Sequence, residues 1–296
     1  MAERKDSKMK KIHNILITAL IISLTFVSCA KKNAVSDEKL IRVGVCAGPY
    51  GDMFVEAVKP ALEEKGYRVS VTEFSDYVQP NVALAENEID VNIFQHSTYL
   101  LDFSKTHNLP LTYISEIPTA AMGIFSEKYK SFDEAPDNIT VAIPNDDTNL
   151  ARALRVLAQI NIVDFEEGTN PAKAVTKNAI SSKKITFTEV SAEILPSVLD
   201  STDFAVINGN YALSAGLKLS DAVYNEKLGE GYFNVIAVRE ADKEKDFSKD
   251  IVSIVHSEVF RKIIEDPSKQ YSAFGKPNGY YENISAAPSV GDSCCS

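Results

Sequence analysis

The chain has 296 residues, of which 45% are hydrophobic and 24% are charged. This composition is typical of globular proteins and excludes disordered and collagen-like chains. The 31 basic residues face 41 acidic ones, for a net charge of −10, which argues against a nucleic-acid partner. Four cysteines are too few for a disulfide scaffold. The length allows two domains of about 130 residues, each able to bury a core.

The N-terminal residues predict a secretory signal. Basic residues at 8, 10 and 11 precede an apolar segment from Ile15 to Val27, and the small residue Ser28 precedes Cys29. This order is typical of a signal peptide. The alternative is a membrane-spanning anchor, for which the apolar part is short, since a spanning helix needs about 20 residues. The pattern resembles a bacterial lipoprotein signal, so we expect cleavage after residue 28, a lipid on Cys29 and a polar linker over 29–38.

The chain after the linker alternates between patterns typical of strands and of helices. We expect strands at 41–46, 68–74 and 91–94, and helices at 53–65, 81–86 and 97–106. Strand–helix–strand units of this kind predict a parallel sheet covered by helices.

A second block begins near Pro118. It has strand patterns at 120–125, 139–143, 184–190, 204–207 and 234–238, and helical patterns at 148–159 and 257–264. The chain from Tyr280 has few residues that could form a core, so we expect a flexible tail over 284–296. The sequence therefore predicts an α/β protein with two lobes.

Motifs for catalysis are absent from the sequence. It has no nucleophile elbow, no zinc-protease motif, no P-loop and no dinucleotide fingerprint. Its four histidines lie far apart and have no nearby cysteine, so a zinc site is not expected. We therefore expect a protein that is not an enzyme and that holds neither a metal nor a cofactor.

Four clusters of polar and aromatic residues follow predicted strands, at 74–81, 92–100, 143–154 and 206–212. In open α/β sheets, ligands bind where the carboxyl ends of strands meet the next helices. The recurrence of the pattern at this position predicts one shared site.

The residue types in these clusters suit an amino acid. Arg152 offers a carboxylate a two-pronged donor, and a helix N-terminus close to it favours an anion. Asparagine side chains can both donate and accept hydrogen bonds, and the candidates are Asn149, Asn208 and Asn210. An aromatic wall for the side chain would come from Tyr77, Phe94, His96 and Tyr99.

Each residue alone also has a simpler interpretation. Arg152 fits an exposed position on an amphipathic helix, and Asn208-Gly209 is a common turn pair. Phe94 and Tyr99 fit a hydrophobic core. The prediction of a ligand site rests on the combination. If Arg152 holds the ligand, its replacement by alanine is expected to weaken binding with little loss of fold.

The longer motifs resemble those of the NlpA lipoproteins, the methionine-binding subunits of bacterial ABC importers. The matching segments are FSDYVQPN (74–81), IDVNIFQHSTYL (89–100), IPNDDTNLARAL (143–154), FAVINGNYAL (204–213) and YFNVIAV (232–238). The resemblance implies a periplasmic-binding-protein fold of type II, in which crossing strands join two α/β lobes around a cleft. It places lobe 1 at 39–117 plus 235–283 and lobe 2 at 118–234.

The resemblance also implies ligand contacts and partners. The implied contacts are Tyr77, Phe94, His96, Tyr99, Asn145, Asn149, Arg152, Asn208, Asn210 and Asn234. Arg152 would hold the α-carboxylate, and Asn208 and Asn234 the other backbone groups. The expected partners are L-methionine, an ABC importer permease and a membrane reached through the lipid on Cys29, and the protein is expected to be a monomer in the cell envelope. Another small amino acid, D-methionine, a methionine-containing dipeptide or a surface interaction role without transport remain alternatives.

Overall fold

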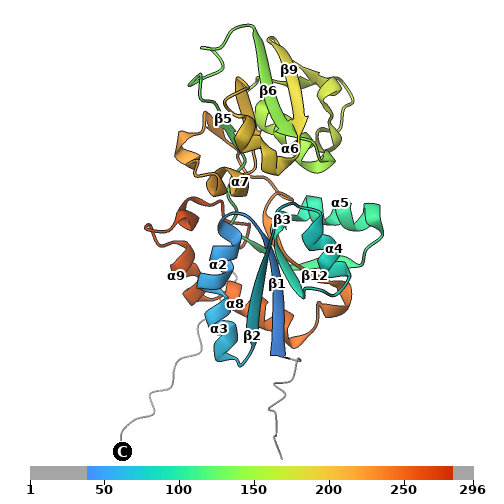
Figure 1. Ribbon diagram of the computed structural model, residues 1–296, viewed down its shortest axis with the longest axis vertical. Helices are drawn as coiled ribbons and strands as arrows, with labels where there is room; N and C mark the ends of the chain where they lie inside the picture. Colours follow the sequence, from blue (N-terminus) through green and yellow to red (C-terminus); the bar gives the residue numbers. More distant parts are fainter. Residues whose placement is uncertain (1–38, 283–296) are drawn as a thin grey trace, which may run out of the picture. The chain divides into compact units, whose positions relative to one another are not determined.

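The structure, a computed structural model, describes residues 39–282 (Figure 1). The predicted signal peptide, Cys29, the linker at 29–38 and the tail at 284–296 lie outside the described residues. Within residues 39–282, no helix is both long and apolar enough to cross a membrane.

The first sheet has five strands in the order β2-β1-β3-β12-β4. The strands β1, β2 and β3 are parallel, whereas β12 runs antiparallel to both β3 and β4. The strand bounds are β1 Leu40–Cys46, β2 Arg68–Phe74, β3 Val91–His96, β4 Leu111–Ile117 and β12 Asn234–Arg239. The helices of this part are α2 Pro49–Ala57, α3 Lys59–Glu64, α4 Gln79–Ala85, α5 Ser97–His107, α8 Asp246–Val255 and α9 Glu258–Ile264.

Helices cover both faces of this sheet, as the alternation of side chains along β12 demonstrates. Ile236 and Val238 pack in a core with α2, α3, α8 and α9. Val235 and Ala237 pack in a second core with α4 and α5. Because successive side chains of a strand point to opposite faces, the two cores lie on opposite sides of the sheet, with α2 on one side and α4 on the other (Figure 1).

The second sheet has the order β11-β5-β10-β6-β9. β6 is parallel to β9 and β10, and β5 is antiparallel to β10 and β11. The bounds are β5 Gly123–Phe125, β6 Asn138–Pro144, β9 Lys184–Val190, β10 Phe204–Ile207, β11 Tyr224–Asn225, α6 Asp147–Ala158 and α7 Gly209–Ser214. The two faces are again buried: Phe204 and Val206 pack with α6, and Ala205 and Ile207 pack with the segment around α7.

Short elements complete the described chain. They are the strand pair β7 Asp164–Phe165 and β8 Ala179–Ile180 and the 3-10 helices η2 Pro171–Lys173, η3 Thr176–Asn178, η4 Ala192–Val198, η5 Leu219–Asp221, η6 Glu240–Asp242 and η7 Gln270–Ala273.

The chain passes twice between the sheets, from β4 to β5 and from β11 to β12. The first sheet draws on residues 40–117 and 234–239, and the second on 123–225. We propose the division into two lobes with one change: Asn234, predicted to end lobe 2, is the first residue of β12 in the first sheet.

Three elements around the first sheet differ from those predicted, and one of them is helix α8, which was not predicted. The expected helix over 53–65 is two helices, α2 and α3, which meet at Val58. Pro60 lies in the first turn of α3, where its missing N–H costs nothing and its ring prevents the preceding helix from continuing. Strand β4 was not predicted. Its alternation is weak, since Tyr113 is only half-buried and the buried Ser115 is polar.

Candidate functional site

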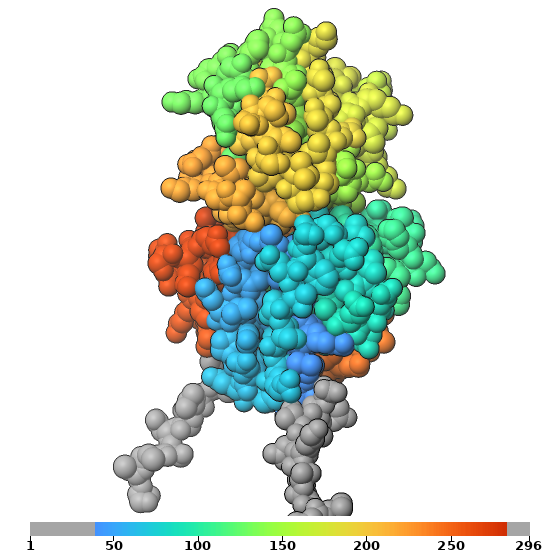
Figure 2. Space-filling model, viewed as in Figure 1, coloured from blue at the N-terminus to red at the C-terminus, as the bar shows by residue number. Residues whose placement is uncertain are grey.

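A pocket with an empty volume of about 310 Å³ lies between the two sheets. The space-filling view shows the part of the chain around the first sheet (blue and teal) in contact with the part around the second sheet (orange and yellow) on the visible face (Figure 2). The lining side chains are themselves largely buried.

The structure brings together all but one of the predicted ligand contacts. The pocket is lined by Tyr77, Phe94, His96, Tyr99, Asn149, Arg152, Asn208, Asn210 and Asn234. The exception is Asn145, which is exposed and lies in a neighbouring depression with Asp76 and Ser191. The lining also includes residues that the sequence analysis did not select, namely Tyr50, Gln95, Ala120 and Gly209.

The aromatic wall is built around Tyr77. Its ring stacks on Phe94 at 5.5 Å between centroids and on Tyr211 at 5.0 Å. Tyr99 meets both Tyr77 and Phe94 edge-on, at 5.9 and 6.3 Å. These spacings are typical of favourable aromatic pairs, so the rings form a fixed apolar surface.

Buried amides fix the strand that carries part of this wall. Every residue of β3 is buried, although Asn92 and Gln95 are polar. Both side chains bond to Asn81 of α4: Asn81 donates to Gln95 Oε1 at 2.8 Å, and Asn92 and Gln95 donate to Asn81 Oδ1 at 2.9 and 2.6 Å. Because buried amides without partners are costly, this network holds β3 and α4 in one arrangement.

His96 ends β3 and caps the next helix. Its Nδ1 accepts the Tyr99 N–H at 3.1 Å, so the hydrogen of the neutral ring lies on Nε2. The Nε2–H donates to Asn149 Oδ1 at 3.3 Å. Burial, together with the charge of Arg152, lowers the pKa of His96 well below its ordinary value. The ring is therefore a neutral donor in the pocket.

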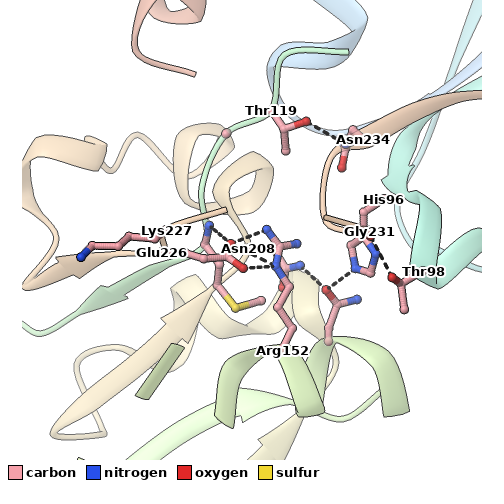
Figure 3. A network of polar contacts seen from close by, with 12 residues as sticks. His96, Thr98, Thr119, Arg152, Asn208, Glu226, Lys227, Gly231 and Asn234 are labelled. Carbon is pink, nitrogen blue, oxygen red and sulfur yellow. Dashed lines mark hydrogen bonds and ion pairs between the residues drawn. The ribbon is translucent and has the colours of Figure 1, made fainter. Parts of the chain in front are cut away.

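Arg152 is buried, with 4% of its side chain exposed, and this excludes the interpretation as a surface residue. Helix α6 begins at the cap Asp146 and directs Asn149 and Arg152, one turn apart, toward the pocket. The partner of Arg152 is Glu226, which was not predicted from the sequence. Arg152 Nε donates to both Glu226 oxygens at 3.0 and 3.1 Å, and Nη2 donates to Oε2 at 2.6 Å (Figure 3).

The pair with Glu226 leaves one edge of the guanidinium for a ligand. Burial alone would lower the pKa of Arg152, but the charge of Glu226 and the hydrogen bonds to it, with smaller contributions from Tyr50 and Tyr77, together outweigh burial and the pKa is raised, so the cation is maintained. Within residues 39–282, no hydrogen bond is seen from Nη1, and the guanidinium carbon lies 5.4 Å from the centre of the Tyr232 ring. Glu226 thus occupies the edge formed by Nε and Nη2. The two N–H groups of Nη1 and the second N–H of Nη2 are the remaining donors.

Asn208 supplies a hydrogen-bond acceptor to the pocket, whereas Arg152 supplies donors. It follows β10 and is 4% exposed. Its Nδ2 donates to Asn149 Oδ1 at 2.8 Å. Its Oδ1 is buried and has no hydrogen-bond partner in the described part of the chain. A buried acceptor without a donor is costly, so this oxygen is prepared for a donor on a ligand.

The side-chain amides of Asn210 and Asn234 form hydrogen bonds that connect separate segments of the chain. Asn210 accepts from the Tyr77 hydroxyl at 2.6 Å and donates to the Ala47 carbonyl at 3.1 Å, which joins the two sheets. Asn234 donates from Nδ2 to the Phe94 carbonyl at 3.0 Å. The main role of Asn210 in the structure is therefore to connect the two sides of the pocket.

Gly209 allows the segments to approach closely. A Cβ atom there would lie 2.5 Å from the Ala121 carbonyl oxygen and 2.7 Å from the Ala120 Cβ. Any side chain at 209 would push α7 away from the connection between β4 and β5. The absence of a side chain therefore keeps Asn208 beside the pocket.

Taken together, the pocket presents a cationic donor, a buried acceptor and an aromatic surface. This combination suits a zwitterion with an apolar side chain. Within residues 39–282, no cluster of three or more histidine, cysteine or acidic side chains could hold a metal ion.

Comparison with known proteins gives a consistent result. The family model of the NlpA lipoproteins matches residues 41–274. The chain is 34% identical to the D-methionine-binding lipoprotein MetQ of Escherichia coli K12, over 82% of this chain and 90% of the relative. It is 31% identical to the probable D-methionine-binding lipoprotein MetQ of Haemophilus influenzae, over 89% of this chain and 97% of the relative.

Solved structures agree with the fold. A nutrient-binding protein from Burkholderia cenocepacia bound to methionine superposes with a TM-score of 0.73 and 36% identity, covering 79% of this chain and 97% of that one. The type II periplasmic-binding fold is thereby confirmed, as is the prediction of a binding protein rather than an enzyme. The chain is a member of the NlpA lipoprotein family.

Proposed function

We propose that this protein captures L-methionine and delivers it to the permease of an ABC importer. The observation that carries the proposal is that Arg152 Nη1 and Asn208 Oδ1 lie in one pocket and that neither forms a hydrogen bond with another atom of residues 39–282. A carboxylate at Nη1 and an ammonium at Oδ1 satisfy both groups together. Names of the relatives support methionine as the ligand.

The aromatic wall supports a thioether side chain. With the ammonium and the carboxylate held at Asn208 and Arg152, the side chain would extend toward Tyr77, Phe94 and Tyr99. A sulfur atom against an aromatic ring contributes about 0.3–1.5 kcal/mol. Methionine is thereby favoured over leucine by a modest margin.

Titration calorimetry on protein stripped of ligand by unfolding and refolding tests this proposal. We expect L-methionine to bind more tightly than leucine, and leucine more tightly than the polar glutamine. Binding of another amino acid in preference to methionine would overturn the ligand, and absence of binding to any amino acid would favour a surface interaction role.

D-Methionine is the second candidate, because the names of the curated relatives specify this enantiomer. The same titration with D-methionine and with a methionine-containing dipeptide ranks the alternatives. A dipeptide needs open space beyond the position of the ammonium. Binding of a dipeptide would therefore indicate that the pocket has an opening next to Asn208. Tighter binding of D-methionine than of L-methionine would contradict the proposed stereospecificity.

We also propose that a lipid on Cys29 holds the protein at a membrane of the cell envelope. Cys29 follows the apolar segment and a small residue in the sequence, and the family is one of lipoproteins. A Cys29→Ser variant is expected to appear in the soluble fraction after cell disruption, whereas the unchanged protein sediments with membranes. An uncleaved variant that still sediments with membranes would instead identify residues 1–28 as a spanning anchor.

A further inference from the structure

We propose that Asp146, which does not line the pocket, determines that Asn208 presents an acceptor to the ligand. On this view Asp146 is a positioning residue that selects for an ammonium group through Asn149 and Asn208. The inference rests on the proposed binding of an amino acid, and it concerns how the site distinguishes that group.

The first step is the contact between Asp146 and Asn149. Asn149 Nδ2 donates to Asp146 Oδ1 and to Oδ2, both at 3.0 Å. A carboxylate only accepts hydrogen bonds, so the NH₂ group of Asn149 must face it. The carbonyl oxygen of the same side chain then points the other way, toward the pocket.

The orientation of the Asn149 amide in turn determines which atoms of Asn208 and His96 can bond to it. Asn149 Oδ1 accepts from Asn208 Nδ2 at 2.8 Å and from His96 Nε2 at 3.3 Å. His96 is fixed as a donor, because its Nδ1 already accepts the Tyr99 N–H. Since the NH₂ group of Asn208 must face the oxygen of Asn149, its own oxygen is the atom that has no hydrogen-bond partner among residues 39–282.

The polarity of the ligand subsite therefore depends on the Asp146 carboxylate, which accepts from Asn149 twice at 3.0 Å, and is supported by the longer contact from His96 at 3.3 Å. An amide can turn by half a rotation and exchange its oxygen and nitrogen at little steric cost. If Asn149 turned, Asn208 would turn with it and would offer an NH₂ group in place of an acceptor. A ligand ammonium would then meet a donor. Asp146 opposes that turn because its oxygens offer no hydrogen to Asn149.

The simpler interpretation is that Asp146 only caps α6. Its Oδ1 accepts the Asn149 backbone N–H at 3.0 Å, as an N-cap residue does. The cap needs one oxygen, however. Within residues 39–282, Oδ2 has a single hydrogen-bond partner, the side chain of Asn149. An N-cap role therefore does not explain the hydrogen bond that Asp146 Oδ2 accepts from the Asn149 side chain.

The substitution Asp146→Asn separates the two roles. Asparagine caps helices as well as aspartate does, so α6 is expected to keep its stability. It replaces Oδ2 by an NH₂ group, which faces the NH₂ group of Asn149 and destabilises its present orientation. Asp147→Asn is the matched control, because it removes the same charge from the same helical turn at an exposed residue for which no contact with Asn149 is seen.

The experiment measures the affinities of stripped protein for L-methionine and for 4-(methylthio)butanoate, which lacks the amino group. Asp146→Asn is expected to weaken methionine binding at least about tenfold, the scale of one hydrogen bond to a charged group. Binding of the analogue is expected to change much less, and Asp147→Asn to change neither. Equal losses for both ligands, or the same loss with Asp147→Asn, would overturn the inference.

A second measurement separates this inference from the proposed ligand. In the NMR spectrum of the ligand-free protein, the Nδ2 protons of Asn208 and the Nε2 proton of His96 are expected to show a nuclear Overhauser effect, because both donate to one oxygen. Asp146→Asn is expected to abolish it while the melting temperature is unchanged. Its absence from the unchanged protein would overturn the relay, whichever ligand binds. Failure of the unchanged protein to bind methionine would overturn only the proposed function.

Discussion

Replacing Arg152 by methionine is expected to lower the free energy of unfolding by about 3–5 kcal/mol, the cost of leaving one member of a buried ion pair alone. Both side chains of the pair with Glu226 are only 4% exposed, so water cannot solvate the remaining carboxylate. For a protein of this size, the melting temperature should fall by roughly 10 °C. Methionine binding should be lost as well, because Nη1 is removed.

A double variant provides the control. Arg152→Met combined with Glu226→Gln removes both charges and still leaves an acceptor for the Met122 N–H, which donates to Glu226 at 3.2 Å. We expect this variant to recover most of the stability but none of the binding. Equal stability of the single variant and the unchanged protein would show that Glu226 does not depend on Arg152. The sequence-based expectation that the fold tolerates loss of Arg152 takes no account of Glu226.

L-Methionine is expected to stabilise the stripped protein by about 4 kcal/mol at a thousandfold excess over its dissociation constant. The pocket draws Tyr77 and His96 from segments at the edge of the first sheet, and Arg152 of α6 and Asn208 after β10 from segments at the edge of the second. The second side supplies the contacts to the ammonium and the carboxylate, and the first side supplies the aromatic wall for the ligand side chain. The whole ligand is therefore bound only where the two sides meet, and the ligand favours that state.

Thermal unfolding measures this effect as a rise in melting temperature of roughly 10 °C. Leucine and glutamine at the same concentration serve as controls and should produce smaller rises. A large rise with another amino acid and none with methionine would contradict the proposed ligand, although the fold would be unaffected.

Local sequence patterns led to several of the residues that line the pocket. Arg152 and Asn149 follow a clear strand-to-helix junction, and the periodicity of α6 placed them close to their observed positions. Asn208 follows the apolar strand β10 in the same way. In each case the junction itself signals the edge of the sheet at which ligands bind.

Glu226 and Tyr50 were missed because their roles depend on tertiary contacts. Glu226 follows β11, a strand of two residues without periodicity, and it meets Arg152 across 74 positions of sequence. Tyr50 lies in the first turn of α2, and its hydroxyl accepts the Ala120 N–H at 3.0 Å. No local pattern distinguishes either residue from an ordinary surface or core position.

Asn145 was predicted to contact the ligand, but it does not line the pocket. It lies inside a motif of the family, two residues after a buried strand position, yet it is exposed and outside the pocket. Neighbouring residues at the end of a strand point in different directions. A motif therefore identifies the segment, and the fold decides which of its side chains reach the ligand.

The most direct test of the central claim is a crystal structure of the stripped protein with free L-selenomethionine. An anomalous difference peak is expected beside Tyr77, Phe94 and Tyr99, with the ligand carboxylate at Arg152 Nη1 and its ammonium at Asn208 Oδ1. Such a peak would locate the thioether position within the aromatic wall. A selenium peak outside this pocket, or a ligand bound with its carboxylate toward Asn208, would contradict the account.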